Sequence, residues 1–362
     1  MALPTDPPPD KPARQPLYEA STQFKNWRFS PDQLAQTRGA LNKAAVGAIQ
    51  MTFETDEPGS SANVSFLGWE EEVTLVKLYI SKIPQLCGHF RFPEEVEATA
   101  ISYLKRFYLK NTVMDWHPKN VMLTALFLAT KTTNHPISLE AYTTNIPRTA
   151  PSDVLDLEFL VSQSLNFEFT VWHAHRALWG IVLDVQSLQP PTDSAPIPSY
   201  PELYEQAIPH IHASRLTDAE FIYTPSQIAL AAVALVEPDL ASRWMEAKHV
   251  ALNSKTALLS LQSTVEAIKA MITSSGSPPD VEAVREVDRR LRICKNPEKV
   301  VGSKAYLLKK AEEERKADEK RNKKAAEVQK AISDGDPFGE SLGDASSGGL
   351  GLVDYDDDDD DD

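Results

Sequence analysis

The chain has 362 residues, of which 42% are hydrophobic and 25% charged, and its formal net charge is −15 at pH 7. These values predict a globular protein of about two domains plus tails and exclude a wholly disordered chain. The negative charge argues against direct nucleic-acid binding, and the absence of a long apolar run or an apolar signal region at the N-terminus argues against membrane insertion and secretion.

The N-terminal segment 1–25 is predicted to be a disordered arm, because six of its first sixteen residues are proline. A helix is expected to follow in NWRFSPDQL, residues 26–34, where Ser30 can cap, Pro31 fits the first helical position and Gln33 completes a capping box. Residues 50–65 mix turn formers with acids and lack periodicity. Segment 26–65 is therefore predicted to be a helix and a connector.

Segment 66–170 is predicted to be a bundle of five helices. Their expected starts, in chain order, lie near Phe66, Pro93, Pro118, Ser138 and Ser152 or Asp153. The third helix contains VMLTALFLAT, which is apolar on nearly every side. A helix of this kind belongs at the centre of a bundle.

Segment 171–276 is predicted to be a second bundle of the same kind. Its helices are expected from about residue 173, over 200–216, over 225–236 and over 254–273, with a proline-rich loop at 189–201. Thr224, Pro225 and Gln227 repeat the cap, first-position proline and third-position amide of the N-terminal helix. The predicted fold class is all-α: two tandem five-helix domains with flanking N- and C-terminal helices and disordered tails.

Segment 277–330 is predicted to hold charged C-terminal helices, the first over residues 280–294. In the second, the pairs Glu312/Lys316 and Glu319/Lys323 have the i,i+4 spacing that supports a solvated helix. Segment 331–362 ends in DYDDDDDDD, which repels itself and is predicted to be a disordered acidic tail.

No catalytic, metal or cofactor site is predicted, since the sequence has no glycine-rich phosphate loop, nucleophile elbow or HExxH helix. The pairs His173/His175 and His210/His212 are spaced i,i+2, which on a helix would point the rings to different faces. The only cysteines, at positions 87 and 294, give neither a disulfide framework nor a four-ligand zinc site and fit a reducing intracellular compartment.

Two charged residues interrupt apolar patterns. Glu158 falls within the stripe of apolar residues expected to face the core from the fifth helix, so it should lie at an exposed edge or meet a hydrogen-bond donor. Lys131 ends the apolar third helix, where a cation suits any helix C-terminus. A Lys/Glu pair exposed on one face is also suited to clamp a partner's backbone by donating and accepting hydrogen bonds.

Three segments carry a resemblance to a known family. RFYLKNTVMDWHPKNVMLTALFLATK (106–131), LTDAEFIYTPSQIAL (216–230) and NWRFSPDQL (26–34) resemble the cyclins, and among them the cyclin H subfamily. The resemblance covers about residues 26–291 and implies two cyclin boxes. It also implies that Lys131 and Glu158 bind a kinase, although TKTTNHP after residue 129 departs from the acid that many cyclins carry after the lysine.

The resemblance implies a non-catalytic regulatory subunit. It would bind and activate a cyclin-dependent kinase that acts on other such kinases and on the RNA polymerase II tail. The implied partners are this kinase, a RING-containing assembly factor and the core of transcription factor IIH, in the nucleus. The alternatives are a transcription cyclin of C or K type, a transcription factor IIB-like double bundle that binds DNA, and an enzyme with an unrecognised site. The segment 26–34 argues against the first, and the absence of a basic stripe and a zinc ribbon against the second.

Overall fold

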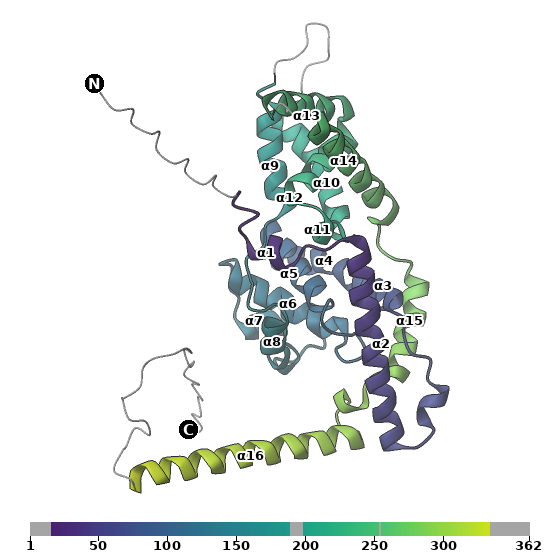
Figure 1. Ribbon diagram of the computed structural model, residues 1–362, viewed down its shortest axis with the longest axis vertical. Helices are drawn as coiled ribbons and strands as arrows, with labels where there is room; N and C mark the ends of the chain where they lie inside the picture. Colours follow the sequence, from purple (N-terminus) through teal and green to yellow (C-terminus); the bar gives the residue numbers. More distant parts are fainter. Residues whose placement is uncertain (1–15, 189–197, 253–254, 334–362) are drawn as a thin grey trace, which may run out of the picture. The chain divides into compact units, whose positions relative to one another are not determined.

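The computed structural model describes residues 16–188, 198–252 and 255–333, and these residues form helices and connecting segments without a strand (Figure 1). The chain divides into two compact units, residues 1–300 and 301–362, which are described separately. None of the described helices has the length and apolarity needed to cross a bilayer. The predicted all-α class is confirmed.

The N-terminal unit begins with helix α1 (Thr22–Asn26) and the long helix α2 (Pro31–Asp56), followed by the short 3-10 helix η1 (Ser60–Asn63). The capping box predicted at Ser30 and Gln33 is present. Residues 16–25, expected in the disordered arm, instead form a turn and most of α1. The reason is local: the Ser21 side chain caps α1, and Gln23 is buried against the backbone of Trp172. The rest of the predicted arm, residues 1–15, lies outside the described residues.

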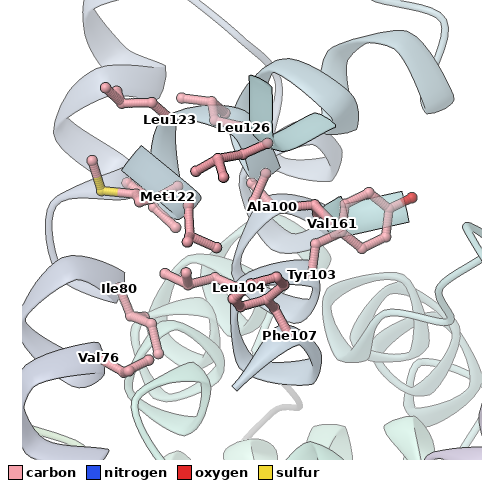
Figure 2. Packing of buried hydrophobic residues seen from close by; sticks show 14 of the residues in the cluster. Val76, Ile80, Ala100, Tyr103, Leu104, Phe107, Met122, Leu123, Leu126 and Val161 are labelled. Carbon is pink, nitrogen blue, oxygen red and sulfur yellow. The ribbon is translucent and has the colours of Figure 1, made fainter. Parts of the chain in front are cut away.

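The first helical domain packs its helices around one apolar centre. The helices are α3 (Trp69–Ile80), α4 (Ile83–Phe90), α5 (Glu94–Phe107), α6 (Pro118–Thr132), α7 (Leu139–Thr144) and α8 (Ser152–Ser164). Eleven residues of α6 are buried, and this helix packs against α3, α5 and α8, so the predicted central helix is confirmed. Figure 2 shows Leu104 and Phe107 of α5 in the same core cluster as Met122 and Leu126 of α6. Helix α4, between the first two predicted helices, was not predicted.

The second helical domain repeats the plan around α12. Its helices are α9 (Ala174–Val185), α10 (Tyr200–Arg215), α11 (Ala219–Ile222), α12 (Pro225–Val236), α13 (Pro238–Leu252) and α14 (Lys255–Ser275). The capping box at Thr224 and Gln227 forms as predicted. Helix α13 was not predicted, and residues 189–197 of the expected proline-rich loop lie outside the described residues.

Helix α15 (Val281–Cys294) returns to the first domain, where Val284, Val287 and Leu291 join its core, and the 3-10 helix η2 (Pro297–Lys299) follows. In the second unit, helix α16 (Lys304–Ser333) exposes nearly all of its side chains and extends into the segment expected to be a tail. Lys316 pairs with Glu312 at 2.7 Å as predicted. The predicted Glu319/Lys323 pair is wrong, because Glu319 accepts from Arg315 at 2.7 Å instead. The acidic residues 334–362 lie outside the described residues.

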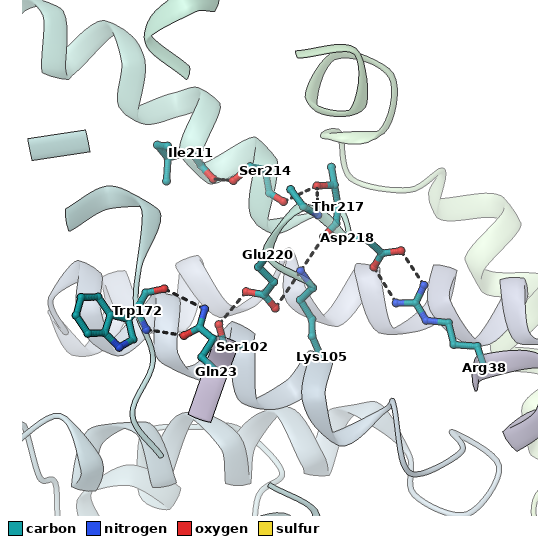
Figure 3. A network of polar contacts seen from close by, with 11 residues as sticks. Gln23, Arg38, Ser102, Lys105, Trp172, Ile211, Ser214, Thr217, Asp218 and Glu220 are labelled. Carbon is teal, nitrogen blue, oxygen red and sulfur yellow. Dashed lines mark hydrogen bonds and ion pairs between the residues drawn. The ribbon is translucent and has the colours of Figure 1, made fainter. Parts of the chain in front are cut away.

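A polar strip joins the two domains (Figure 3). The ammonium of Lys105 on α5 is buried and donates to the Thr217 carbonyl at 2.6 Å, and it lies 3.1 Å from Glu220. Arg38 on α2 makes two 2.7 Å hydrogen bonds to the carboxylate of Asp218. Buried charges with paired, directional hydrogen bonds tolerate little displacement, so the strip fixes the second domain against α2 and α5.

Candidate functional site

Lys131 lies in the last turn of α6, where its charge faces the negative end of the helix dipole. Its Nζ atom is 2.6 Å from Oε1 of Glu158 and 4.5 Å from the centroid of the buried Phe127 ring. The Lys131 and Glu158 side chains are 42% and 21% exposed. The two residues singled out by the sequence therefore form one ion pair, with the ammonium held over an aromatic face and open to solvent.

Glu158 is placed by the periodicity of α8. Val154, Leu157 and Val161 are buried in the core, as predicted, and the partly exposed Glu158 lies at the edge of this stripe and meets the Lys131 ammonium. Both of the outcomes expected for this carboxylate, an edge position and a donor, are realised.

Exposed apolar side chains lie on α8, which carries Glu158, and just beyond its end. Leu155 and Phe159, at i,i+4 spacing on the outer side of α8, are both exposed, and Leu155 lies three residues before Glu158. Phe167, just beyond α8, is also exposed, with its ring centroid 6.2 Å from that of Phe159. We call Lys131, Leu155, Glu158, Phe159 and Phe167 the docking face. Exposed apolar side chains together with a partly exposed charged pair have the composition of a protein interface.

The backbone that presents Phe167 is strained. Asn166 and Phe167 have φ angles of 53° and 56°, in the left-handed region that bulky residues avoid. Their amides donate to the carbonyls of Gln163 and Ser162 at 2.9 Å, which closes the C-terminal end of α8. Glu168 follows, and its carboxylate accepts from Asn26 and Trp27, both at 2.6 Å. These bonds hold Phe167 in an exposed position.

Sequence reasoning found the ion pair but missed the three apolar residues of the docking face. The exposure of Leu155 and Phe159 could have been predicted, since these apolar residues are at i,i+4 spacing and lie outside the buried stripe of α8. That of Phe167 could not, because it depends on the left-handed turn.

The sequence matches two family descriptions. Residues 63–170 match "Cyclin, N-terminal domain" and residues 173–273 match "Cyclin C-terminal domain". Cyclin mcs2 of Schizosaccharomyces pombe is 30% identical over 327 residues, covering 89% of this chain and 98% of that protein. The chain belongs to the cyclin family. The predicted pair of tandem cyclin boxes is confirmed, and Lys131 and Glu158 both come from the first box.

This cyclin has other named relatives and is also similar to chains in two solved complexes. Cyclin-H of Xenopus laevis is 31% identical, and the match covers 60% of this chain and 67% of that protein. Cyclin CCL1 of Saccharomyces cerevisiae is 33% identical, and the match covers 64% of this chain and 61% of that protein. A chain in the CAK complex from Chaetomium thermophilum bound to ATP-gamma-S superposes with a TM-score of 0.72, at 27% identity, covering 82% of this chain and 94% of that chain. A chain in the yeast TFIIK (Kin28/Ccl1/Tfb3) complex superposes with a TM-score of 0.59, at 30% identity, and the match covers 70% of this chain and 100% of that chain.

The histidines of this cyclin differ from the sequence expectation. His173 and His175 are stacked, with ring centroids 5.1 Å apart, because His173 is the extended N-cap of α9 rather than a helical residue. Both rings are buried. Burial and the neighbouring Arg215 lower the pKa of His175 to about 4, and burial with the His175 ring lowers that of His173 well below its usual range.

One further cluster has the spacing of metal ligands. Atoms of Glu94, Glu97 and His212 lie within 4.8 Å of one another. The Arg215 guanidinium already donates to both carboxylates, at 2.7 Å to Glu97. Burial raises the pKa of Glu94, but His212 and Arg215 outweigh it and bring the value down to about 2. Arg215 thus takes the place of a cation here, and the cluster joins α5 of the first box to α10 of the second.

Proposed function

We propose that this cyclin is a cyclin H-type regulatory subunit that binds and activates a cyclin-dependent kinase through the docking face. The observation that carries this proposal is the Lys131–Glu158 pair, at 2.6 Å, together with the exposed side chains of Leu155, Phe159 and Phe167 on and just beyond α8. Relatives named cyclin-H and the CAK and TFIIK complexes support the choice of subfamily. Cyclin-C1-1 of Arabidopsis thaliana covers only 30% of this chain, which favours the H type over the C type.

The mechanism follows from what an active kinase requires. A glutamate on the kinase αC helix must pair with the lysine that positions the ATP phosphates. The docking face packs against αC, its apolar residues bury area, and Lys131 and Glu158 hydrogen-bond to backbone groups near the end of that helix. Shifting a kinase from 1:99 to 99:1 in favour of the active form takes about 5.5 kcal/mol of differential binding, within reach of an interface of ordinary size.

The rigidity of the first box lets most of the binding energy act on the kinase rather than on ordering the docking face. The docking face rests on α6 and α8, whose inner residues belong to one apolar core, and Glu168 ties the segment after Phe167 to Asn26 and Trp27. A preorganised surface loses little of its binding energy to ordering on association. The chain itself supplies no catalytic residue in this scheme, since the kinase performs the phosphoryl transfer.

The remaining partners follow from the subfamily. The chain is proposed to work in the nucleus with a RING-containing assembly factor and the core of transcription factor IIH, and to contact neither nucleic acid nor membrane directly. Tfb3 in the yeast TFIIK complex supports a third subunit beside the kinase and cyclin. Within that assembly the kinase would act on the RNA polymerase II tail and on other cyclin-dependent kinases.

The test is the double variant K131A/E158A, measured for activation of the kinase that co-purifies with the tagged chain. We expect a folded protein with strongly reduced activation, because the pair is partly exposed and contributes about 1 kcal/mol or less to folding. The matched control is E312A/K316A, which removes another Lys/Glu pair, at 2.7 Å, from α16. Wild-type activation by K131A/E158A, or an equal loss in the control, would rule the proposal out.

A further inference from the structure

Three aromatic rings form a cluster on the second box, away from the residues of the docking face. The Trp179 ring on α9 lies 5.0 Å from Tyr200 and 5.4 Å from Tyr204 of α10, measured between ring centroids. The two tyrosine rings are nearly parallel, 6.2 Å apart at 19°. Trp179 is 48% exposed, and Leu183, one turn further along α9, is exposed as well. We call Trp179, Leu183, Tyr200 and Tyr204 the aromatic cradle.

The aromatic cradle lies at the edge of the second core: Tyr200 and Tyr204 are partly buried and pack against this core, whereas Trp179 and Leu183 are exposed. Leu178, Ile181 and Val182 carry the buried face of α9, whereas Trp179 and Leu183 point away from it. The hydroxyl of Tyr200 is shielded from solvent and has no hydrogen-bond partner among the described residues. The exposed Trp179 and Leu183 side chains offer apolar surface on one face of α9, which is suited to a ligand.

The chemistry of the cradle selects a class of ligand. Spaced aromatic rings accept proline rings between them, and hydroxyl donors bind the backbone carbonyls that a polyproline II helix leaves without internal hydrogen bonds. Such a helix is formed before binding, so docking it costs little entropy. A proline-rich segment is therefore a suitable ligand for the exposed Trp179 ring and the two tyrosine rings beside it.

The chain carries a segment of this kind close to the cradle. Residues 1–15 contain five prolines, at positions 4, 7, 8, 9 and 12. The described chain begins beside α9, where the Tyr18 ring packs edge-on against Trp172 at 6.0 Å. The exposed positions 176, 179, 180 and 183 then form a stripe along α9 that includes the cradle residues.

The segment that precedes Leu17 is long enough to reach Trp179. Trp179 lies about 8 Å along α9 from its first residue, at about 1.5 Å per residue. The eight to ten residues between Leu17 and Pro9 or Pro7 span about 25–30 Å as a polyproline II helix. We propose that the proline-rich segment 4–12 docks on the aromatic cradle of the same chain and so withholds this surface from proline-rich segments of other proteins.

The experiment is fluorine NMR on the full chain labelled with 5-fluorotryptophan. The chain has six tryptophans, and the variant W179F assigns the Trp179 signal by its loss. We expect P7A/P8A/P9A to shift the Trp179 signal and leave those of Trp116 and Trp244 in place. The matched control is P190A/P191A, which alters a proline pair in the loop before α10 and is expected to leave the Trp179 signal unchanged. Adding a peptide of residues 1–16 to a chain without residues 2–15 should restore the wild-type position.

Three outcomes would overturn the proposal. The first is a Trp179 signal that does not respond to P7A/P8A/P9A. The second is a larger response to P190A/P191A, which would make the loop the occupant. The third is a signal whose position in the wild-type chain changes with protein concentration, which would make a second copy the source of the proline-rich segment. None of these outcomes bears on kinase activation, so the proposed function is tested separately.

Discussion

Phe159 is the residue of the docking face whose removal should weaken kinase binding most. Its side chain is 69% exposed, which leaves about 140 Å² of apolar surface for a partner if a phenylalanine offers about 200 Å². At about 25 cal/mol per Å², full burial is worth about 3.5 kcal/mol. We expect F159A to lose about 2–3 kcal/mol of this, which weakens the Kd about 30- to 150-fold.

The assay is titration calorimetry of the kinase with wild-type, F159A and L259A chains, together with kinase activity at saturating cyclin. Leu259 on α14 is 66% exposed and lies outside the docking face, so L259A controls for the loss of an exposed apolar side chain. Saturating F159A should restore full activity, because the variant changes affinity and not the active form. A Kd for F159A within threefold of wild type, or an equal loss in L259A, would refute the assignment of the face.

Three further predictions concern stability and reactivity. R38A removes both hydrogen bonds to Asp218 and should cost about 1–3 kcal/mol in urea unfolding, and R38A/D218A should cost less than the two single variants added together. His175 is neutral in the folded state because its pKa is about 4, so the unfolded chain, with a value near 6.5, takes up this proton first as the pH falls. The wild type should therefore lose about 2 kcal/mol of unfolding free energy through this group between pH 7 and pH 5, a loss absent from H175Q. Burial raises the pKa of Cys87 to about 12 and also raises that of Cys294, so iodoacetamide at pH 8 should modify neither in the native chain and both in urea.

Helices with strong local signals were predictable from the sequence. The capping boxes at Ser30 and Thr224 fix helix starts through neighbouring residues alone, and the apolar circumference of α6 requires a central position. Helices α4 and α13 were missed because each follows its predecessor after only one or two residues. A proline stands at or next to the start of each, at positions 84 and 238, but the short connections hide the break from a periodicity argument.

The ion pair of the docking face was predictable because each partner breaks an apolar pattern on its own helix. The pairing in α16 shows the limit of the same reasoning. Glu319 has a cation four residues away on either side, Arg315 and Lys323, and spacing alone does not decide between them. The exposure of Phe167 could not be predicted, because the left-handed turn at Asn166 and Phe167 contains no glycine that would indicate it in the sequence.

The buried ammonium of Lys105 decides how this protein can be dissected. Its acceptors, Thr217 and Glu220, belong to the other box, so a fragment that ends near residue 170 would lack both acceptors and expose the ammonium to water. Truncation would therefore change the surface of the first box as well as remove the second. Point substitutions on the surface are the informative way to separate one activity from another.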